Sequence, residues 1–231
     1  MTETTAPRTA RARARAELTQ EIVDTARAHL AVDGAAGLSL RAVARDLGMV
    51  SSAVYRYFPS RDDLLTRLII DAYNALGEAA EGAEAQVRRG DLRGRWLATA
   101  DGVRRWGLTH PHEWGLLYGT PVPGYAAPPD TIDPANRVTG LLIALLAEMH
   151  APDGASTAPV PKAARASLTK VRAVIPDSVP DDLIFRGLMA WTQLIGTVTL
   201  EVNGQFDNVI SGMDAYFDHV MRRTAVSLDL G

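Results

Sequence analysis

The chain has 231 residues, enough to build a core in one or two domains, and it carries 24 basic and 27 acidic side chains. This near balance provides no global field that would demand a nucleic-acid or membrane partner. The absence of cysteine excludes disulfides, thiol catalysis and cysteine-based zinc sites. The longest apolar run, Leu141–Ala147, is far too short to span a membrane, so we expect a cytoplasmic protein without a membrane partner.

The charge is unevenly distributed along the chain. Residues 1–67 carry 10 basic and 8 acidic side chains, whereas residues 68–231 carry 14 and 19. A flexible basic arm is expected over residues 1–15, because four arginines lie there: Arg8, Arg11, Arg13 and Arg15. Such an arm suits a chain that touches a polyanion at one end only. A disordered tail that only aids solubility explains the arm equally well.

Helical periodicity predicts a first helix that ends at Asp33-Gly34 and whose apolar face is formed by Leu18, Ile22, Val23, Ala26 and Leu30. A second helix follows, capped by Ser39. A third is expected from Ser51 to Phe58, which is too short to be stable without tertiary packing. Ser60 and Asp63 have the spacing of a capping box, which predicts the start of a long fourth helix.

The remainder of the chain also has helical periodicity. Apolar residues from Val138 to Met149 and from Val209 to Val220 recur at the i, i+3, i+4 spacing. Residues Gly196–Val202 alternate like a strand, but they continue an apolar stretch from Leu183 and no partner strand is evident. We therefore predict an all-α fold of roughly nine or ten helices.

The third predicted helix has a polar side that packing does not explain. Ser51, Ser52, Tyr55 and Arg56 point away from the core, and their hydroxyl and guanidinium groups can donate to phosphate oxygens and base edges. Gly48 lies where two crossing helices need a permissive turn. This pattern is typical of a helix-turn-helix, in which the second helix enters the major groove. Spacing alone leaves open a merely polar face on a small three-helix subdomain.

The run S-x-R-x-V-A-x-x-L-G-M…A-V-Y-R-Y-F-P-S-R-D-D-L-L, between residues 39 and 65, resembles the DNA-binding motif of the tetracycline-repressor (TetR) family of bacterial regulators. The resemblance covers about residues 16–68. It implies a three-helix helix-turn-helix domain over residues 16–62, followed by a larger helical ligand-binding and dimerisation domain over residues 63–231.

The resemblance also implies a set of DNA-binding residues, which are Ser39, Arg41, Ser51, Ser52, Ala53, Tyr55, Arg56, Tyr57 and Arg61. Residues 51–53 would face the bases, and Arg41 would reach the groove or its edge. Tyr55, Tyr57 and Arg61 would hold phosphates. Tyr57 and Arg61 stand where the family often has histidine and lysine, and both keep a hydrogen-bond donor.

Val50 is a departure from the family pattern, which usually has Ser or Thr as the cap of the recognition helix at this position. Two alternatives follow. Either the cap moves to Ser51, which removes that residue from base reading, or the start of the helix is less well fixed.

Beyond residue 68 the resemblance is looser. The segment Ala190–Phe206 resembles a helix that packs against its twofold mate in the family. The implied dimer interface comprises Gly187, Ala190, Leu194, Val198, Met213 and Phe217. An ordinary buried helix within a monomer is the alternative.

Aromatic residues in this half could line a pocket for an apolar ligand. The segment from His110 to Pro121 resembles part of the ligand-binding domain in one branch of the family. The expected pocket residues are Trp96, Trp106, Trp114, Tyr118, Phe185, Met189 and Thr192, together with Trp191. Each of the aromatic residues, taken singly, fits a core position better.

A metal site is considered at His110, His112 and Glu113, but Pro111 interrupts helical presentation and no further ligand cluster supports the site. We therefore expect no metal and no cofactor.

Paired carboxylates also fail to indicate an enzyme. Asp62-Asp63 and Asp181-Asp182 both open predicted helices, where the helix dipole favours acidic groups. No phosphate-binding glycine loop and no nucleophile-elbow motif occurs in the sequence. Enzymatic activity is not expected.

Together, the sequence predicts a transcriptional repressor that binds a palindromic operator as a homodimer and is released by a small apolar molecule. The expected partners are double-stranded DNA, a second copy of the chain and the effector. The alternative is a DNA-binding dimer without a small-molecule ligand, and a sizeable cavity in the second domain would discriminate between the two.

Overall fold

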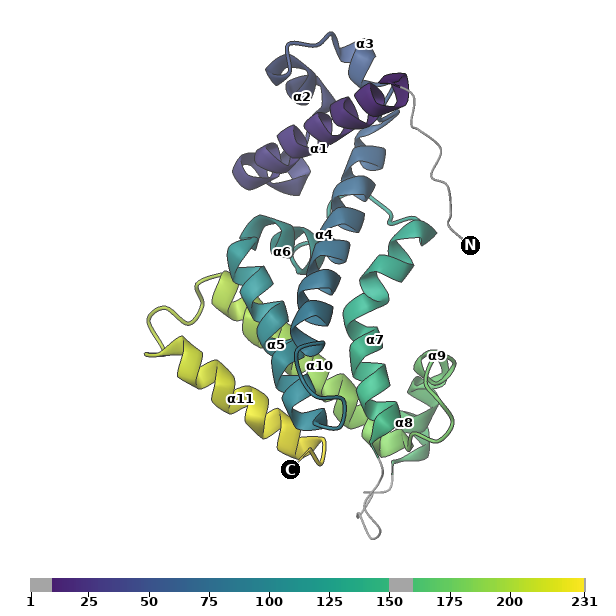
Figure 1. Cartoon of the computed structure of the whole chain (residues 1–231), viewed down its shortest axis with the longest axis vertical. Helices are drawn as coiled ribbons and strands as arrows, with labels where there is room; N and C mark the ends of the chain where they lie inside the picture. The colour runs from purple at the N-terminus through teal and green to yellow at the C-terminus, as the bar shows by residue number, and fades with distance from the viewer. Residues whose placement is uncertain (1–9, 150–159, 231) are drawn as a thin grey trace. The chain divides into compact units, whose positions relative to one another are not determined.

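The computed structural model describes residues 10–149 and 160–230. These residues form eleven α-helices and one short 3-10 helix, with no strand among them, so the predicted all-α class is confirmed (Figure 1). Residues 196–202 are helical, as expected. The described chain divides into two compact units, residues 10–72 with 115–131 and residues 73–114 with 132–230. The division therefore falls after Ala72, later than the expected boundary after Asp62.

The first unit begins with α1 (Ala10–Gly37), α2 (Leu40–Asp46) and α3 (Ser51–Val54), which α4 (Arg61–Glu84) follows. Because α1 starts at Ala10, residues 10–15 of the predicted flexible arm are helical, and residues 1–9, with Arg8, lie outside the described residues. Gly34 interrupts α1 with φ 66° and ψ 175°, close to the predicted stop.

The core of the first unit contains the apolar faces that the periodicity predicts. Its fully or nearly fully buried side chains include Ile22, Val23, Ala26, Leu30, Val43, Ala44, Val54, Phe58, Leu64 and Leu65. At about 25 cal/mol per Å² of apolar surface removed from water, this burial stabilises helices too short to fold alone.

Helix α3 is shorter than the predicted Ser51–Phe58 segment. After Val54 the bonds tighten to the i→i+3 type, with Arg56 N donating to Ala53 O at 3.2 Å and Tyr57 N donating to Val54 O at 2.9 Å. Pro59 follows Phe58 and disfavours helical geometry at that residue. The chain therefore leaves α3 through a turn.

The start of α4 has the predicted serine cap. Ser60 Oγ accepts from Asp63 N at 3.1 Å and donates to the Asp63 carboxylate at 2.7 Å. Asp62 and Asp63 lie in the first turn of α4, as Asp181 and Asp182 do in α10, where the helix dipole stabilises acidic groups.

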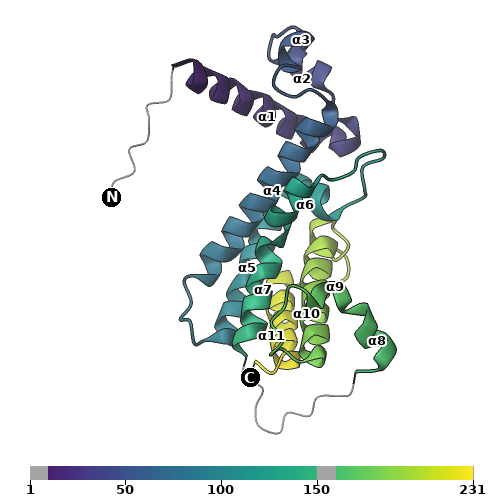
Figure 2. The ribbon, with the colours of Figure 1, turned by 90° about the vertical axis from the view of Figure 1, so that its right-hand side faces the viewer.

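The second unit contains the end of α4, then α5 (Leu92–Thr109), the first residues of α6 (Pro111–Tyr118), α7 (Ile132–Glu148), α8 (Lys162–Ser167), α9 (Thr169–Arg172), α10 (Asp181–Val202) and α11 (Met213–Ser227). The 3-10 helix η1 (Pro129–Thr131) precedes α7. Figures 1 and 2 show α10 beside α5, α7 and α11, and these helices are in contact. Helix α6 extends into the loop of residues 119–131, which belongs to the first unit.

By length and composition, α10 is apolar enough to span a membrane, and it is the one such helix among the described residues. Its apolar side chains are divided between two opposite faces. Ala190, Leu194 and Val198 are fully buried, whereas Met189 and Leu200 are exposed. The packing of the buried face inside the protein explains much of the apolar composition of α10.

Buried arginines connect the helices of the second unit. Arg104 on α5 binds both oxygens of Glu201 on α10, at 2.8 and 2.6 Å, and Asp214 on α11, at 2.7 Å. The hydrogen bond to Glu201 is the main cause of a pKa for Arg104 above its ordinary value, so its charge is permanent. Arg95, 1% exposed, donates to Glu148 on α7 at 2.8 Å and also binds Glu84 on α4.

Replacing Arg104 by Ala is expected to destabilise the protein by about 3–5 kcal/mol, because the Glu201 carboxylate would remain buried without its partner. Urea unfolding followed by circular dichroism measures this loss. The neighbouring Arg105→Ala is the matched control, since Arg105 is largely exposed and pairs with Asp101, and it should cost less than about 0.5 kcal/mol. Equal losses in the two variants would contradict a structural role for the Arg104 network.

Candidate nucleic-acid interface

The turn between α2 and α3 is a Schellman motif centred on Gly48. Gly48 N donates to Arg45 O at 3.0 Å, and Met49 N donates to Ala44 O at 2.8 Å. Gly48 has φ +64°, a conformation that costs a residue with a Cβ roughly 1 kcal/mol. The glycine therefore fixes the angle at which α3 leaves α2.

Helix α3 presents a polar face to solvent. Ser52, Tyr55 and Arg56 are exposed, Ser51 and Ala53 are half-buried, and Val54 is buried in the core. This is the arrangement that the sequence predicts, in which a short helix buries one side and offers donors on the other.

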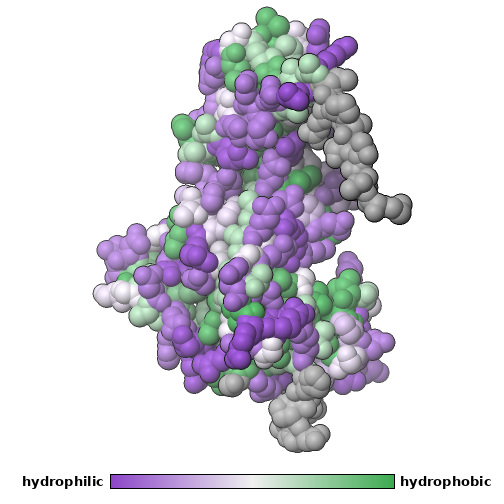
Figure 3. Space-filling model, in the orientation of Figure 1, coloured by the Kyte–Doolittle hydropathy of each residue, from purple (hydrophilic) through white to green (hydrophobic). Residues whose placement is uncertain are grey.

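The structure decides between the two alternatives for Val50. Val50 occupies the N-cap position with extended geometry (φ −69°, ψ 138°) and provides no side-chain cap, while Ser51 is the first helical residue. The cap has therefore not moved to Ser51. The backbone bond from Ala53 N to Val50 O, 2.9 Å, closes the first turn in place of a side-chain cap. Val50 is 71% exposed, and Figure 3 shows apolar surface at the tip where Figure 1 draws α3.

Helix α2 adds basic groups to the interface. Arg41 is exposed, as a DNA-contacting residue must be. Arg45 lies four residues later, so it is on the same face, and its side chain is also exposed. Sequence reasoning missed Arg45, although its spacing from Arg41 was a usable signal. Ser39 has a different use, because its Oγ accepts from Ala42 N at 3.4 Å and caps α2.

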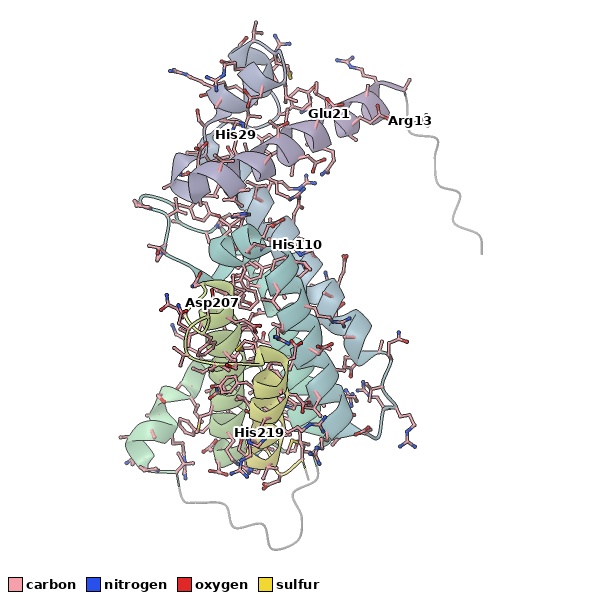
Figure 4. All side chains as sticks on the ribbon, turned by 90° about the vertical axis from the view of Figure 1, so that its left-hand side faces the viewer. Arg13, Glu21, His29, His110, Asp207 and His219 are labelled. Carbon is pink, nitrogen blue, oxygen red and sulfur yellow. The ribbon has the colours of Figure 1, made fainter. Side chains whose placement is uncertain are left out.

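The end of α3 is held by the first turns of α1. The Arg15 guanidinium lies over the Tyr57 ring, 4.8 Å from its centroid, and also donates to Arg56 O at 3.3 Å. Tyr57 is half-buried as a result, whereas Tyr55 is exposed. The arginines Arg11 and Arg13 are exposed on the same part of α1, and Figure 4 labels Arg13.

A hydrogen bond also connects α1 to α2. His29 Nε2 and Asp46 Oδ2 are 2.6 Å apart, and Figure 4 labels His29. The hydrogen bond from His29 is the main cause of a pKa for Asp46 below its ordinary value. Asp46 is therefore ionised at neutral pH, and it partly offsets the charge of the exposed Arg45 beside it.

The position of Arg61 differs from the phosphate-binding role implied by the sequence. Its guanidinium donates to Leu38 O at 3.1 Å, Ala35 O at 2.7 Å and Ala36 O at 3.1 Å. These carbonyls lie after the break at Gly34, at the end of α1 and in the turn that follows it. In this chain Arg61 joins the start of α4 to the end of α1.

Known proteins match this arrangement over most of the chain. The family model described as "Bacterial regulatory proteins, tetR family" matches residues 22–68, and the model described as "Tetracyclin repressor-like, C-terminal domain" matches residues 96–224. The chain belongs to the TetR family. It is a DNA-binding transcriptional regulator and not an enzyme.

Individual relatives agree with this assignment. The HTH-type transcriptional regulators Rv1816 of Mycobacterium tuberculosis and Mb1846 of Mycobacterium bovis are each 42% identical over 196 residues, covering 84% of both chains. The crystal structure of the regulatory protein SCO4313 superposes with a TM-score of 0.77 at 33% identity, covering 95% of this chain and 98% of that one. A TetR variant from Acinetobacter baumannii, solved in complex with minocycline, shares the fold at 18% identity and a TM-score of 0.54, covering 90% and 94%.

Three of the four tryptophans that the sequence assigns to the ligand pocket of this TetR-family protein are core residues. Trp96 is fully buried and donates to Met221 O at 2.9 Å, and Trp114 donates to Thr199 Oγ1 at 3.1 Å. Trp106 is buried and stacks on His110, 5.1 Å between ring centroids. Tyr118 is half-buried at the end of α6. None of these four predicted pocket residues lines either the cavity or the groove described next.

A cavity and a groove in the second unit bear on ligand binding. The first, of about 340 Å³, is formed by α7, α9 with its following turn, and α10, and its lining includes Trp191. The second is a more open groove of about 660 Å³ along α10, lined by the predicted pocket residues Phe185, Met189 and Thr192.

The predicted dimer-interface residues also lie elsewhere than expected. Ala190, Leu194, Val198 and Phe217 are buried inside the second unit, Gly187 lines the 340 Å³ cavity, and Met213 is half-buried. The five buried residues of this set are therefore not available as a partner surface. The exposed face of α10 is instead the one with Met189. At 100° per residue, positions 187 and 189 lie on nearly opposite sides of the helix.

The contacts of Arg61 lead to a test that separates its two roles. Arg61→Ala should lower the free energy of unfolding by about 1–3 kcal/mol, because three carbonyls lose a charged donor. The exposed Arg56→Ala should change stability by less than about 0.5 kcal/mol and weaken DNA binding instead. Urea unfolding and fluorescence anisotropy on labelled DNA measure the two effects. An Arg61→Ala protein with wild-type stability and weakened DNA binding would restore the phosphate role.

Proposed function

We propose that this TetR-family protein is a cytoplasmic repressor that binds a palindromic operator as a homodimer and is released by a small apolar effector. The observation that carries the proposal is the exposed face of α3, held at a fixed angle by the Gly48 turn. A DNA-reading helix placed in this way is the working part of a helix-turn-helix.

The size of α3 supports pairing of two chains. One four-residue helix offers few base contacts, and a second copy related by twofold symmetry doubles them on a palindromic site. Arg41, Arg45 and Arg56 add phosphate and base-edge donors on the same unit.

An uncovered apolar surface supports a homodimer. On α10, Met189 is 67% exposed and Leu200 is 44% exposed, and both line the open groove together with Phe206 and Tyr216. Contiguous exposed apolar surface on a soluble protein usually marks an interaction site. Members of the family act as dimers, which agrees with this use of the groove.

The 340 Å³ cavity favours an effector over the alternative of a ligand-free dimer. Its volume is within the usual range of small-molecule sites, and its lining is mostly apolar. The Acinetobacter baumannii protein shows that a protein of this fold holds a small molecule. To release DNA, the effector must prefer the non-binding state, and DNA must then weaken effector binding by the same factor.

Arg41→Ala should weaken operator binding by about 1–3 kcal/mol and relax selectivity, if its guanidinium reaches a base edge. Tyr55→Phe should weaken binding to operator and random DNA about equally, because a phosphate contact reads no sequence. Anisotropy titrations on the protein's own upstream region and on a scrambled duplex measure both. A change of preferred sequence in Tyr55→Phe would contradict the assignment. Arg222→Ala, a partly exposed α11 variant, is the control and should leave both affinities unchanged.

Met189→Asp should convert the dimer to a monomer at micromolar concentration, because it places a charge in the proposed apolar interface. Light scattering coupled to size-exclusion chromatography gives the mass. Ile132→Asp is the matched control, since Ile132 is a similarly exposed apolar residue outside the groove. A wild-type protein that is monomeric and still binds its operator specifically would disprove the dimer.

A further inference from the structure

The 340 Å³ cavity has three walls. Helix α7 contributes Leu142, Ile143 and Leu146, the α9 segment contributes Val171, Val174 and Ile175, and α10 contributes Ile184, Leu188 and Trp191. In Figures 1 and 2 α8 and α9 lie beside α10, and Figure 3 shows apolar surface over this side of the second unit. The walls therefore provide a continuous apolar lining.

The α9 wall is held to α10 by ion pairs of residues that do not line the cavity. Asp181, in the first turn of α10, binds Arg172 of α9 and also Arg165 of α8, at 2.9 Å. Arg172 further donates to Val179 O at 2.8 Å. These bonds hold Val171 and Ile175 in place, so the cavity is formed before any ligand arrives.

Among the described residues that line the cavity, none is Lys, Arg, His, Asp or Glu. The polar side chains there are Asn136 and Thr139, which lie on α7 together with the lining residue Gly140. Thr139 Oγ1 donates to Asn136 O at 3.1 Å, which leaves its lone pairs able to accept. At 1.5 Å per residue, Asn136 and Leu146 are about 15 Å apart along α7, so the polar groups lie toward one end.

An ion held among the buried lining residues Leu146, Ile175 and Ile184 would lose hydration without gaining a counter-charge. The cost of burying an unpaired ionised group is far larger than that of burying a neutral polar group with a hydrogen bond. We propose that the cavity selects an uncharged, elongated apolar effector with a hydrogen-bonding group at the Asn136–Thr139 end, and rejects ions of the same shape. This inference rests on the proposed effector response and adds its chemical class.

Two fluorescent probes of nearly the same shape test this selectivity on the full chain. N-phenylnaphthylamine is neutral, and anilinonaphthalene sulfonate adds one negative charge to the same ring system. Titration of the wild-type protein should give at least about tenfold tighter binding of the neutral probe. Thr139→Lys places a cation in the wall and should reverse the preference.

A cavity-filling variant locates the probe. A Cβ at Gly140 meets no atom within 4 Å, so Gly140→Leu can fill the cavity without a clash, and it should abolish binding of the neutral probe. Gly82→Leu is the matched control, because Gly82 is also a helical glycine with open space around it and lies outside the cavity. It should bind the neutral probe as the wild type does.

Three outcomes would overturn the inference: no binding of the neutral probe to the wild type, equal affinity for both probes, or unchanged binding in Gly140→Leu. DNA affinity, measured on the same proteins, is independent of these outcomes. Wild-type DNA binding with unselective probe binding would reject the inference and leave the proposed regulatory function unaffected. Loss of operator binding with intact probe selectivity would reject the proposed function alone.

Discussion

Helix α10 carries apolar side chains on two faces, and both faces need to be removed from water. The organisation of the second unit depends on this constraint. Ala190, Leu194 and Val198 are fully buried against the other helices, while Met189 and Leu200 on the opposite face are left to solvent. Burying the first face stabilises the chain, and exposing the second has a cost that a partner can remove. On the buried face, Gly187 leaves room for the Leu146 side chain at the wall of the cavity. One helix thus contributes to core, cavity and candidate interface.

The DNA-binding unit has a different constraint, because α3 has too few residues to be stable alone. Its position is fixed from three sides. The Schellman turn at Gly48 joins it to α2, Val54 anchors it in the core, and Arg15 covers Tyr57 at its exit. His29 fixes α2 to α1 in turn. The donors on the exposed face are therefore held by their neighbours rather than by α3 itself, which suits a surface that must be formed before DNA arrives.

Periodicity predicted the helices and their buried positions well, because the 3.6-residue repeat needs only one apolar stripe to be visible. It could not assign the faces of α10, since two apolar stripes with the same spacing look alike until the neighbouring helices are known. For Arg61, the residue type reveals a donor but not its acceptors, which are the carbonyls of residues 35, 36 and 38, after the break at Gly34. The tryptophans were assigned by composition, which does not distinguish a core from a cavity wall.

Helix α4 belongs to both units, and its ends are bonded to different structures. At its first residue, Arg61 is bound to the carbonyls at the end of α1. Near its other end, Glu81 accepts two bonds from Arg137 of α7, at 2.9 and 2.6 Å. Arg137 follows directly after Asn136, a residue of the cavity wall. Because both bonds of this pair are charge-assisted and run in parallel, they hold α7 against α4 with a fixed geometry that apolar contacts alone do not provide.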